Sequence, residues 1–425
     1  MRTLALLLLA LSTAAPAAAQ DTLRLGALHD AAVERDPRAR QALLQARAAR
    51  LRLENLAASR LPRLELRGDA THQSEVPAIP ITLPGGATPP TPPKDRLEAL
   101  LDVQYTVLDG GVNAGRRRAE EAALAASLAE LTAQLHPLRS EVNEAFFAAA
   151  LLQQRIAETG ALMDDLAAQL GLVRAQVRNG AALPGDTASL RAELLKVSQQ
   201  RAELAADRRA ALRVLALLTG REIAPETALA LPELAARMAG GDDPRAHPRY
   251  AAFAAQRERL ARDEALVRAR TRPQLVAFGQ LAYGRPGLAQ FRGDLHEYWL
   301  AGVRVRWTPW DWGAAGRERE VLAVQRQVVD SEEVAFTERL RREVQDDLQA
   351  IDRLEAALRT DDAIIALREQ VERQARTQLG EHAITPAAYV DARTDVQEAR
   401  ITRHRHRVEL ARARARYLTT LGIEL

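Results

Sequence analysis

An internal repeat constrains the fold of this chain more than any other feature of its sequence. Pro37 and Pro248 stand near the start of two charged, Ala-rich helical segments, and they are 211 positions apart. The prolines that follow these segments, Pro62 and Pro273, are also 211 positions apart. Later matches are offset by 202 positions and join Asp109 to Asp311 and Gly220 to Gly422. Because the units of solenoid proteins are only about 20–50 residues long, this pattern predicts a duplicated half-subunit instead.

Both copies follow one plan, which is helix, strand, loop, strand, very long helix, tight turn and long helix. We predict a first repeat over residues 20–220, a linker over 221–243 and a second repeat over 244–425. Strands are expected at about 61–75, 97–109, 273–284 and 297–310, and helical hairpins at about 112–220 and 314–421. The first helix is expected to run from Leu25 to Ser59, and Pro137 is expected to kink or break the long helix of the first copy. The predicted fold class is mainly α with a small β part.

The strand segments alternate between apolar and polar residues. In the second of them, Leu101, Val103 and Tyr105 alternate with Asp102 and Gln104, which predicts one apolar and one polar face. Each segment has about ten residues, the length that a tilted strand needs to cross the hydrocarbon core of a bilayer. Three of the four tryptophans gather where the last strand ends, at Trp307, Trp310 and Trp312. This clustering is typical of an interfacial aromatic girdle, although a soluble sheet with ordinary strand propensity gives a similar pattern.

The N-terminus has the pattern of a secretory signal peptide. Arg2 precedes an apolar run from Leu4 to Leu11, and Ala17-Ala18-Ala19 supplies the small residues of a cleavage site, so we expect a signal peptide over residues 1–19 that is cleaved near Ala19. No later stretch has the ~20 consecutive apolar residues of a membrane-spanning helix. A membrane location would therefore require strands in a closed barrel. Because known barrels begin at about eight strands, four strands per chain then predict a homotrimer that shares a twelve-stranded barrel.

The composition argues against several other classes of protein. The chain has 59 basic and 56 acidic residues, and a net charge of only +3 does not favour nucleic-acid binding. It has no Cys, which excludes disulfides, cysteine-ligated zinc and a thiol nucleophile. His404 and His406 do not share a helix face and lie among three arginines, so they do not predict a metal site. No catalytic or cofactor motif occurs in a usable context, and we expect no enzyme activity, no cofactor and no metal site.

The turns of the two predicted helical hairpins carry the most specific local signals. In the first turn Asn-Gly ends the outgoing helix, and Pro184 and Asp186 favour the start of the returning helix. In the second turn Thr385 is expected to cap a helix whose first residue is Pro386. The candidate site residues at the two turns are Gly180, Leu183, Pro184, Asp186, Gly380, His382, Thr385 and Pro386.

Taken together, these features resemble the TolC-like outer-membrane efflux proteins, the outer-membrane factors of tripartite export systems. The resemblance rests on the duplicated plan, on Leu61-Pro62-Arg63-Leu64 at a strand entry, on Asp109-Gly110-Gly111 at a strand exit and on both turns. It implies a homotrimer with a twelve-stranded barrel in the outer-membrane lipid and a long α-helical tunnel in the periplasm. It also implies a passive conduit whose tip meets a periplasmic adaptor protein tied to an inner-membrane pump.

The resemblance also implies roles for residues near the tips. The eight turn residues would contact the adaptor, and His382 stands where the family usually has Gly. Some members carry two acidic residues, three positions apart, that ring the tunnel entrance and bind cations. Only Asp391 matches here, because the other position is Ala388, and a solvated helix charge is an equally good interpretation of Asp391.

Two questions stay open at the level of sequence. The first is the cargo, because drugs, metal ions, small metabolites and exported proteins all fit a conduit. The second is the alternative class of protein, a periplasmic coiled-coil scaffold or adaptor that forms no pore. That alternative explains the long helices, but it does not explain the matched pairs of strands whose residues alternate between apolar and polar.

Overall fold

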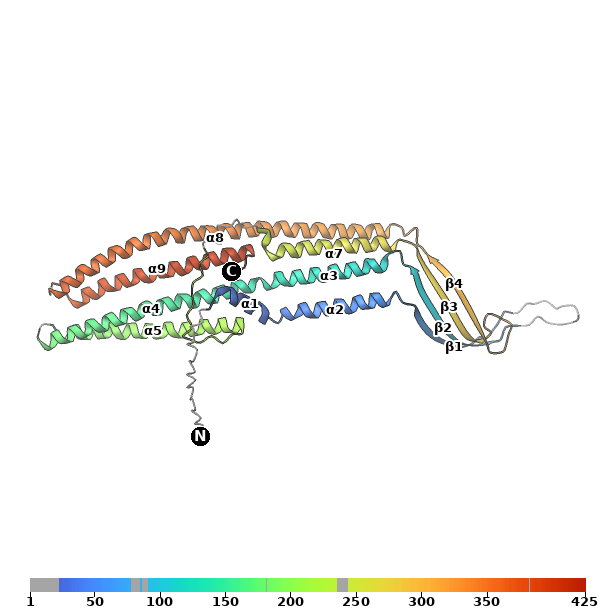
Figure 1. Cartoon of the computed structure of the whole chain (residues 1–425), viewed down its shortest axis with the longest axis horizontal. Coiled ribbons are helices and arrows are strands. Elements are labelled where there is room, and N and C mark those ends of the chain that lie inside the picture. The colour runs from blue at the N-terminus through green and yellow to red at the C-terminus, as the bar shows by residue number, and fades with distance from the viewer. Residues whose placement is uncertain (1–22, 78–84, 86–90, 181, 235–243, 382) are drawn as a thin grey trace, which may run out of the picture. The chain divides into compact units, whose positions relative to one another are not determined.

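A computed structural model describes residues 23–77, 85, 91–180, 182–234, 244–381 and 383–425 (Figure 1). The expected signal peptide and its cleavage site, His382, and residues 235–243 of the expected linker lie outside the described residues. Among the helices that the structure describes, none combines the length and the apolar character needed to cross a bilayer.

The chain forms two compact units, and each unit takes segments from both sequence repeats. The described residues within Met1–Ala39, Gln134–Pro248 and Thr337–Leu425 form one unit, and we call it the hairpin unit. The other comprises Arg40–Ala133 and Arg249–Phe336, and we call it the sheet unit. Duplicated segments therefore pack with each other, as expected of a duplicated half-subunit.

The sheet unit contains four strands and the helices that lead to and from them. The helices are α2 (Ala39–Ala58), α3 (Val112–Leu135), α7 (Pro248–Arg270) and the first part of α8 (Ala314–Gly380). The strands are β1 (Arg63–His72), β2 (Asp95–Leu108), β3 (Gln274–Arg285) and β4 (His296–Arg306). They form one antiparallel sheet in the order β1-β2-β3-β4, so that β2 and β3 join the two repeats (Figure 1).

In each repeat, an aspartate after the second strand stabilises the start of the helix that follows. In the first repeat the Asp109 carboxylate accepts hydrogen bonds from the backbone N–H groups of Gly111, at 2.8 Å, and Asn113, at 2.6 Å. Asp311 does the same for Gly313 at 2.9 Å and Ala315 at 2.8 Å. These bonds satisfy donors that every helix start leaves unpaired.

The two exits differ at the residue after the aspartate. Gly110 adopts a φ of +67°, in the left-handed region that glycine enters without a steric penalty. Trp312 stands at the matching position and adopts a φ of +55°, which is costly for a bulky side chain. Its ring is exposed and lies edge-on to Trp310, with the ring centroids 5.9 Å apart. The second copy therefore has an exposed indole at the end of the sheet on a residue whose backbone is strained.

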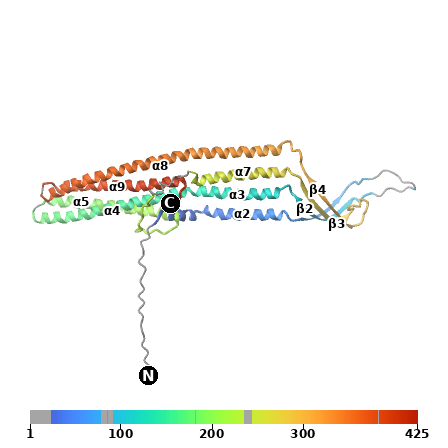
Figure 2. The same cartoon turned by 45° about the horizontal axis from the view of Figure 1, so that its top comes forward.

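The hairpin unit is built from α1 (Leu25–Arg35), two helical hairpins and the short 3-10 helix η1 (Pro244–Ala246). The first hairpin pairs α4 (Pro137–Arg178) with α5 (Pro184–Thr219), and the second pairs the later part of α8 with α9 (Pro386–Leu421). The turns of both hairpins lie at the same end of this unit (Figures 1 and 2). Its largest apolar core includes Leu28, Phe146, Leu215 and Leu418, all fully buried.

A buried polar network runs through this core. His29 Nε2 donates to Asn143 Oδ1 at 2.8 Å, and Asn143 Nδ2 donates to Thr419 Oγ1 at 3.0 Å. His136 Nε2 donates to the carbonyl of Thr419 at 2.8 Å. Burial is the main reason why the pKa values of His29 and His136 lie below the ordinary histidine value, because desolvation disfavours the charged ring.

The first helix differs from the sequence-based expectation. The prediction of one helix from Leu25 to Ser59 was wrong, because α1 ends at Arg35 and α2 begins only at Ala39. Pro37 disfavours helical backbone at Asp36, which has a ψ of 128°, and the Asp36 carboxylate instead accepts the backbone N–H of Arg38 at 2.8 Å. At Pro137 the expected break is present, since α3 ends at Leu135 and α4 begins at Pro137.

Candidate functional site

The first candidate site is the turn between α4 and α5. Asn179 follows the last residue of α4, and Gly180 then turns the chain with a φ of +72°. Leu183 is extended immediately before α5, and Pro184 is the first residue of that helix, where its missing N–H costs nothing. The Asp186 carboxylate reaches back and accepts the backbone N–H of Leu183 at 3.0 Å. The turn is therefore held by local bonds that the sequence already indicated.

The turn between α8 and α9 is built in a similar way. Gly380 is the last residue of α8, and Thr385 is extended before α9. Thr385 Oγ1 accepts the backbone N–H of Ala388 at 3.3 Å, and Pro386 begins the helix. The structure brings the two turns to one end of the hairpin unit (Figure 2). Leu183 is 72% exposed in the single chain, so this end presents apolar surface.

Behind the turns, side chains of α9 contact α4 and α8. Tyr389 is only 1% exposed, and its hydroxyl donates to Glu372 Oε1 at 3.2 Å. Burial raises the pKa of Tyr389, which keeps the hydroxyl protonated as a donor. On the other side, Arg393 Nε donates to Asp165 Oδ2 at 2.8 Å. No local sequence pattern indicates these contacts, because the partners lie on different helices.

Asp391 lies between these contacts in sequence but on a different face of α9. It is exposed, and among the described residues its carboxylate has no hydrogen bond or ion pair in the single chain. This leaves the carboxylate accessible to solvent or to an ion near the turns.

Basic side chains of α9 pair with acids on both neighbouring helices. Arg400 pairs with Glu369 of α8 at 2.7 Å and lowers the pKa of that carboxyl. His404 lies 2.9 Å from Glu158 of α4, whereas His406 lies 2.6 Å from Asp361 of α8. The two histidines therefore point to different helices. Within the described part of the chain, no group of three or more His, Cys, Asp or Glu side chains is arranged to hold a metal ion.

The second candidate site is the sheet itself, whose register separates two faces. One face, which we call the apolar face, carries exposed side chains that are almost all apolar. It includes Leu64, Leu66, Leu97, Leu101, Tyr105, Leu281, Trp299, Val303, Val305 and Trp307. At its middle, Leu66, Leu101, Leu281 and Trp299 stand side by side on the four strands.

The opposite side, which we call the polar face, carries charged and amide side chains. They include Arg63, Glu65, Arg67, Asp69, Arg96, Glu98, Asp102, Gln280, Arg304 and Arg306. Asp102 is only 3% exposed, and its Oδ2 accepts a hydrogen bond from Gln280 at 2.9 Å and lies 4.0 Å from Arg67. The sheet therefore exposes a whole apolar face as well as a charged face in the single chain, whereas a water-soluble sheet normally packs its apolar face against a core.

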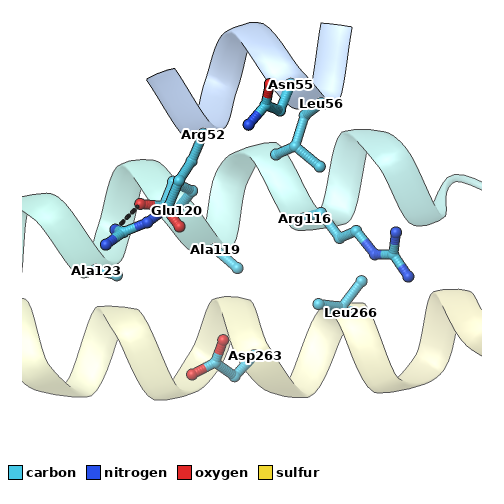
Figure 3. Close-up of a pocket in the computed structure, with 9 residues that line it drawn as sticks. All are labelled: Arg52, Asn55, Leu56, Arg116, Ala119, Glu120, Ala123, Asp263 and Leu266. Carbon is cyan, nitrogen blue, oxygen red and sulfur yellow. Dashed lines mark hydrogen bonds and ion pairs between the residues drawn. The ribbon is translucent and has the colours of Figure 1, made fainter. Parts of the chain in front are cut away.

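The sheet unit also has grooves between its helices. One of them lies between α2, α3 and α7 (Figure 3), and its volume is about 450 Å³. Arg52 and Glu120 form an ion pair across it at 2.6 Å, and burial raises the pKa of Asp263 on α7. Its lining has no serine, threonine or histidine.

Comparison with known proteins agrees with this geometry. The sequence model of the outer membrane efflux protein family matches residues 28–221, which is the first repeat. No curated protein matches the sequence. Solved structures with the same fold include the channel-forming protein CusC, with a TM-score of 0.69, 15% identity and coverage of 95% of this chain and 93% of that chain.

Two further structures are similar over nearly the whole chain. The outer membrane protein VceC from Vibrio cholerae has a TM-score of 0.63 and 16% identity, and the match covers 94% of this chain and 96% of that chain. The open state of the MtrE outer membrane channel from Neisseria gonorrhoeae has a TM-score of 0.64 and 18% identity, with 95% and 89% covered.

The duplicated helix–strand–strand–helix subunit with an outward apolar sheet face is thus the fold of outer-membrane channel subunits. The first repeat matches the model of the outer membrane efflux protein family over residues 28–221, and both repeats share the fold of the solved outer-membrane channels.

Proposed function

We propose that this chain is the outer-membrane channel component of a tripartite efflux or export system. In this role it is a passive conduit and performs no chemistry. The observation that carries the proposal is the exposed apolar face of the sheet, which lies opposite a face that carries the charged side chains. An apolar surface of this extent is stable only in lipid or against a partner. If the apolar face contacts membrane lipid and the polar face contacts water, the apolar side chains avoid water and the charged side chains stay hydrated.

The edges of the sheet explain why several copies are needed. Within the described residues, β1 and β4 each pair with a strand on one side only. All three pairings in the sheet are antiparallel, so β1 and β4 run in opposite directions. The β4 edge of one copy therefore fits the β1 edge of the next in antiparallel pairing, and a closed ring leaves no backbone group unpaired in lipid. Three copies give a barrel of twelve strands, in line with the family resemblance.

The helical hairpins complete the conduit on the periplasmic side. The two turns, from Gly180 to Asp186 and from Gly380 to Pro386, contact a periplasmic adaptor protein that joins the channel to an inner-membrane pump. Exposed Leu183 supports this role, because solvent-exposed apolar side chains at a rigid turn are suitable anchors for a partner. Asp391 contributes one carboxylate per copy to a ring at the tunnel entrance. A signal peptide cleaved near Ala19 directs the chain to the periplasm and outer membrane.

Extraction and conductance test the proposal. The mature protein should require detergent for release from the outer-membrane fraction, should run as a trimer and should form stable pores in planar bilayers. Release by osmotic shock as a monomer without pore activity would show that the chain is a periplasmic scaffold instead.

The turn residues need a separate test with a matched control. Leu183→Asp should weaken binding of the periplasmic adaptor to the purified trimer while pore conductance stays unchanged. Leu195→Asp changes a leucine of similar exposure, 63%, farther along α5, and should leave adaptor binding intact. Equal effects of both substitutions would remove the evidence for a contact at the turn.

The proposed Asp391 ring is tested by divalent-cation block. Magnesium added from the side of the turns should block the wild-type pore, and Asp391→Ala should weaken that block. Block of the same strength in both proteins would identify Asp391 as an ordinary solvated helix charge.

A further inference from the structure

We propose that three arginines on the polar face of the sheet make the pore select anions, so that the cargo of this channel is anionic. The three residues are Arg63, Arg304 and Arg306, and we call them the arginine band. This inference rests on the proposed function, because it requires the polar face to line the lumen.

The strand register places the arginine band on one face and at one end of the sheet. Arg306 is opposite Gln274 and Arg304 is opposite Val276 in the pairing of β3 with β4. Arg63 starts β1 opposite Gln104, which in turn is opposite Phe278. All three arginines therefore lie where α3 and α8 leave the sheet, and they lie on the face opposite Val303 and Val305.

The arginine band is free of acidic partners. All three side chains are exposed in the single chain, and no carboxylate forms an ion pair with them within the part of the chain that the structure describes. Arg304 instead lies over the ring of Phe278, with its guanidinium carbon 4.9 Å from the ring centroid. A guanidinium held over an aromatic ring keeps its charge and its donors available to a passing anion.

Three carboxylates of the polar face form hydrogen bonds or ion pairs with residues outside the arginine band. Glu65 accepts a hydrogen bond from Arg67 at 3.0 Å, and Asp102 is buried beside Arg67 and Gln280. Glu98 pairs with Arg96 at 2.5 Å near the other end of the strands. Glu65 and Asp102 share Arg67 as their counter-charge, and Glu98 has Arg96. The five arginines and four acids of the polar face give it a net charge of +1 per copy, and the arginine band concentrates unpaired positive charge at one end of that face.

Closing the sheet into a ring of copies multiplies this asymmetry. Each copy adds its arginine band at the same level of the lumen, where the walls have a low dielectric constant. A passage lined by one sign of charge raises the local concentration of counter-ions by roughly tenfold or more. Along the sheet, chloride should therefore be concentrated over potassium, and solutes that bear carboxylate or phosphate groups should be favoured over cationic ones. The proposed Asp391 ring acts separately at the turns, where it favours cations.

Reversal potentials under a KCl gradient test the inference on the full trimer in planar bilayers. With the proposed entrance ring removed by Asp391→Ala, the pore should have a chloride-to-potassium permeability ratio above one, and the arginine variants are compared in this background. The ratio should fall toward one at about 1 M salt, where the screening length is only about 3 Å. The double variant Arg304→Gln/Arg306→Gln should lower the ratio several-fold, while Arg304→Lys/Arg306→Lys, which keeps the charges, should preserve it.

Two controls make the outcome specific. Arg292→Gln also removes one positive charge per copy, but its side chain is paired with Asp294 in the β3–β4 connection, so it should change the ratio much less. Arg63→Gln provides an independent test on another strand if the double variant fails to form trimers. An unchanged ratio in trimeric Gln variants, or an equal shift with Arg292→Gln, would overturn the inference while leaving the channel intact. Absence of any wild-type pore would instead refute the proposed function.

Discussion

The two faces of the sheet predict opposite effects for one substitution made at two similar leucines. Leu101 lies near the middle of β2 on the apolar face and is 37% exposed in the single chain. Leu300 of β4 lies on the polar face opposite Gln280 and is 43% exposed. Their chemistry and exposure match, so any difference between Leu101→Arg and Leu300→Arg reports which face meets lipid.

The expected magnitude follows from the cost of placing an arginine against lipid. Such a residue on the lipid-facing side of a barrel costs about 2–4 kcal/mol near the middle of the bilayer. Three copies would then lose about 6–12 kcal/mol in a trimer, which is comparable to the entire stability of an ordinary domain. Leu101→Arg should therefore fail to insert or assemble, whereas Leu300→Arg should place its charge in the water-filled lumen and assemble normally.

The assay is insertion into vesicles followed by semi-native electrophoresis, which separates trimers from monomers. Circular dichroism in detergent confirms that each variant keeps its helices. If Leu101→Arg forms trimers as well as the wild-type chain, or if Leu300→Arg fails equally, the assignment of lipid to the apolar face is wrong.

Three further predictions concern stability in the hairpin unit and its turns. Asn143→Ala removes the link between His29 and Thr419 and should lower the free energy of unfolding by about 1–3 kcal/mol, seen as a lower melting temperature; an unchanged melting temperature would mean that the network contributes nothing. Because burial depresses the pKa values of His29 and His136 below 6.5, the unfolded chain binds protons more readily, so stability should be full above pH 6.5 and should fall as the pH drops through the lower folded-state values. A His29→Gln variant with the same pH dependence in chemical denaturation would contradict this. Gly180→Ala should cost about 1–2 kcal/mol at its left-handed backbone, whereas Gly185→Ala, in open space within the first turn of α5, should be neutral or slightly stabilising; equal melting temperatures would exclude strain at position 180.

Features that depend on neighbouring residues could be predicted from the sequence. The alternation of Leu101 and Asp102 already indicated two faces, because a strand has a period of two. The cap at Thr385 and the break at Pro137 are also local, since each follows from a single side chain acting on adjacent backbone. The division of the first helix at Asp36 was missed although Pro37 was noted, because the apolar periodicity continues on both sides of the break.

Contacts between distant parts of the chain could not be predicted in this way. Arg393 and Asp165 are 228 positions apart, and Asn143 and Thr419 are 276 positions apart. Many arginines of α9 have an acid available on either neighbouring helix, so the choice of partner depends on packing and not on sequence spacing. The arginine band was also missed, since only the register of four strands from both repeats brings Arg63 and Arg304 to the same face and the same end of the sheet.

The pairing of β2 with β3 has a consequence for assembly. Each repeat supplies one pair of strands. The pairing of β2 with β3 is a seam between these two pairs, and it lies within a single polypeptide. If the two halves were separate chains, every seam of the proposed ring would form by collision between free molecules and would lose translational entropy each time. Duplication makes every second seam intramolecular, so the ring closes at a lower concentration of chains, and the two halves are free to diverge, as Trp312 has diverged from Gly110.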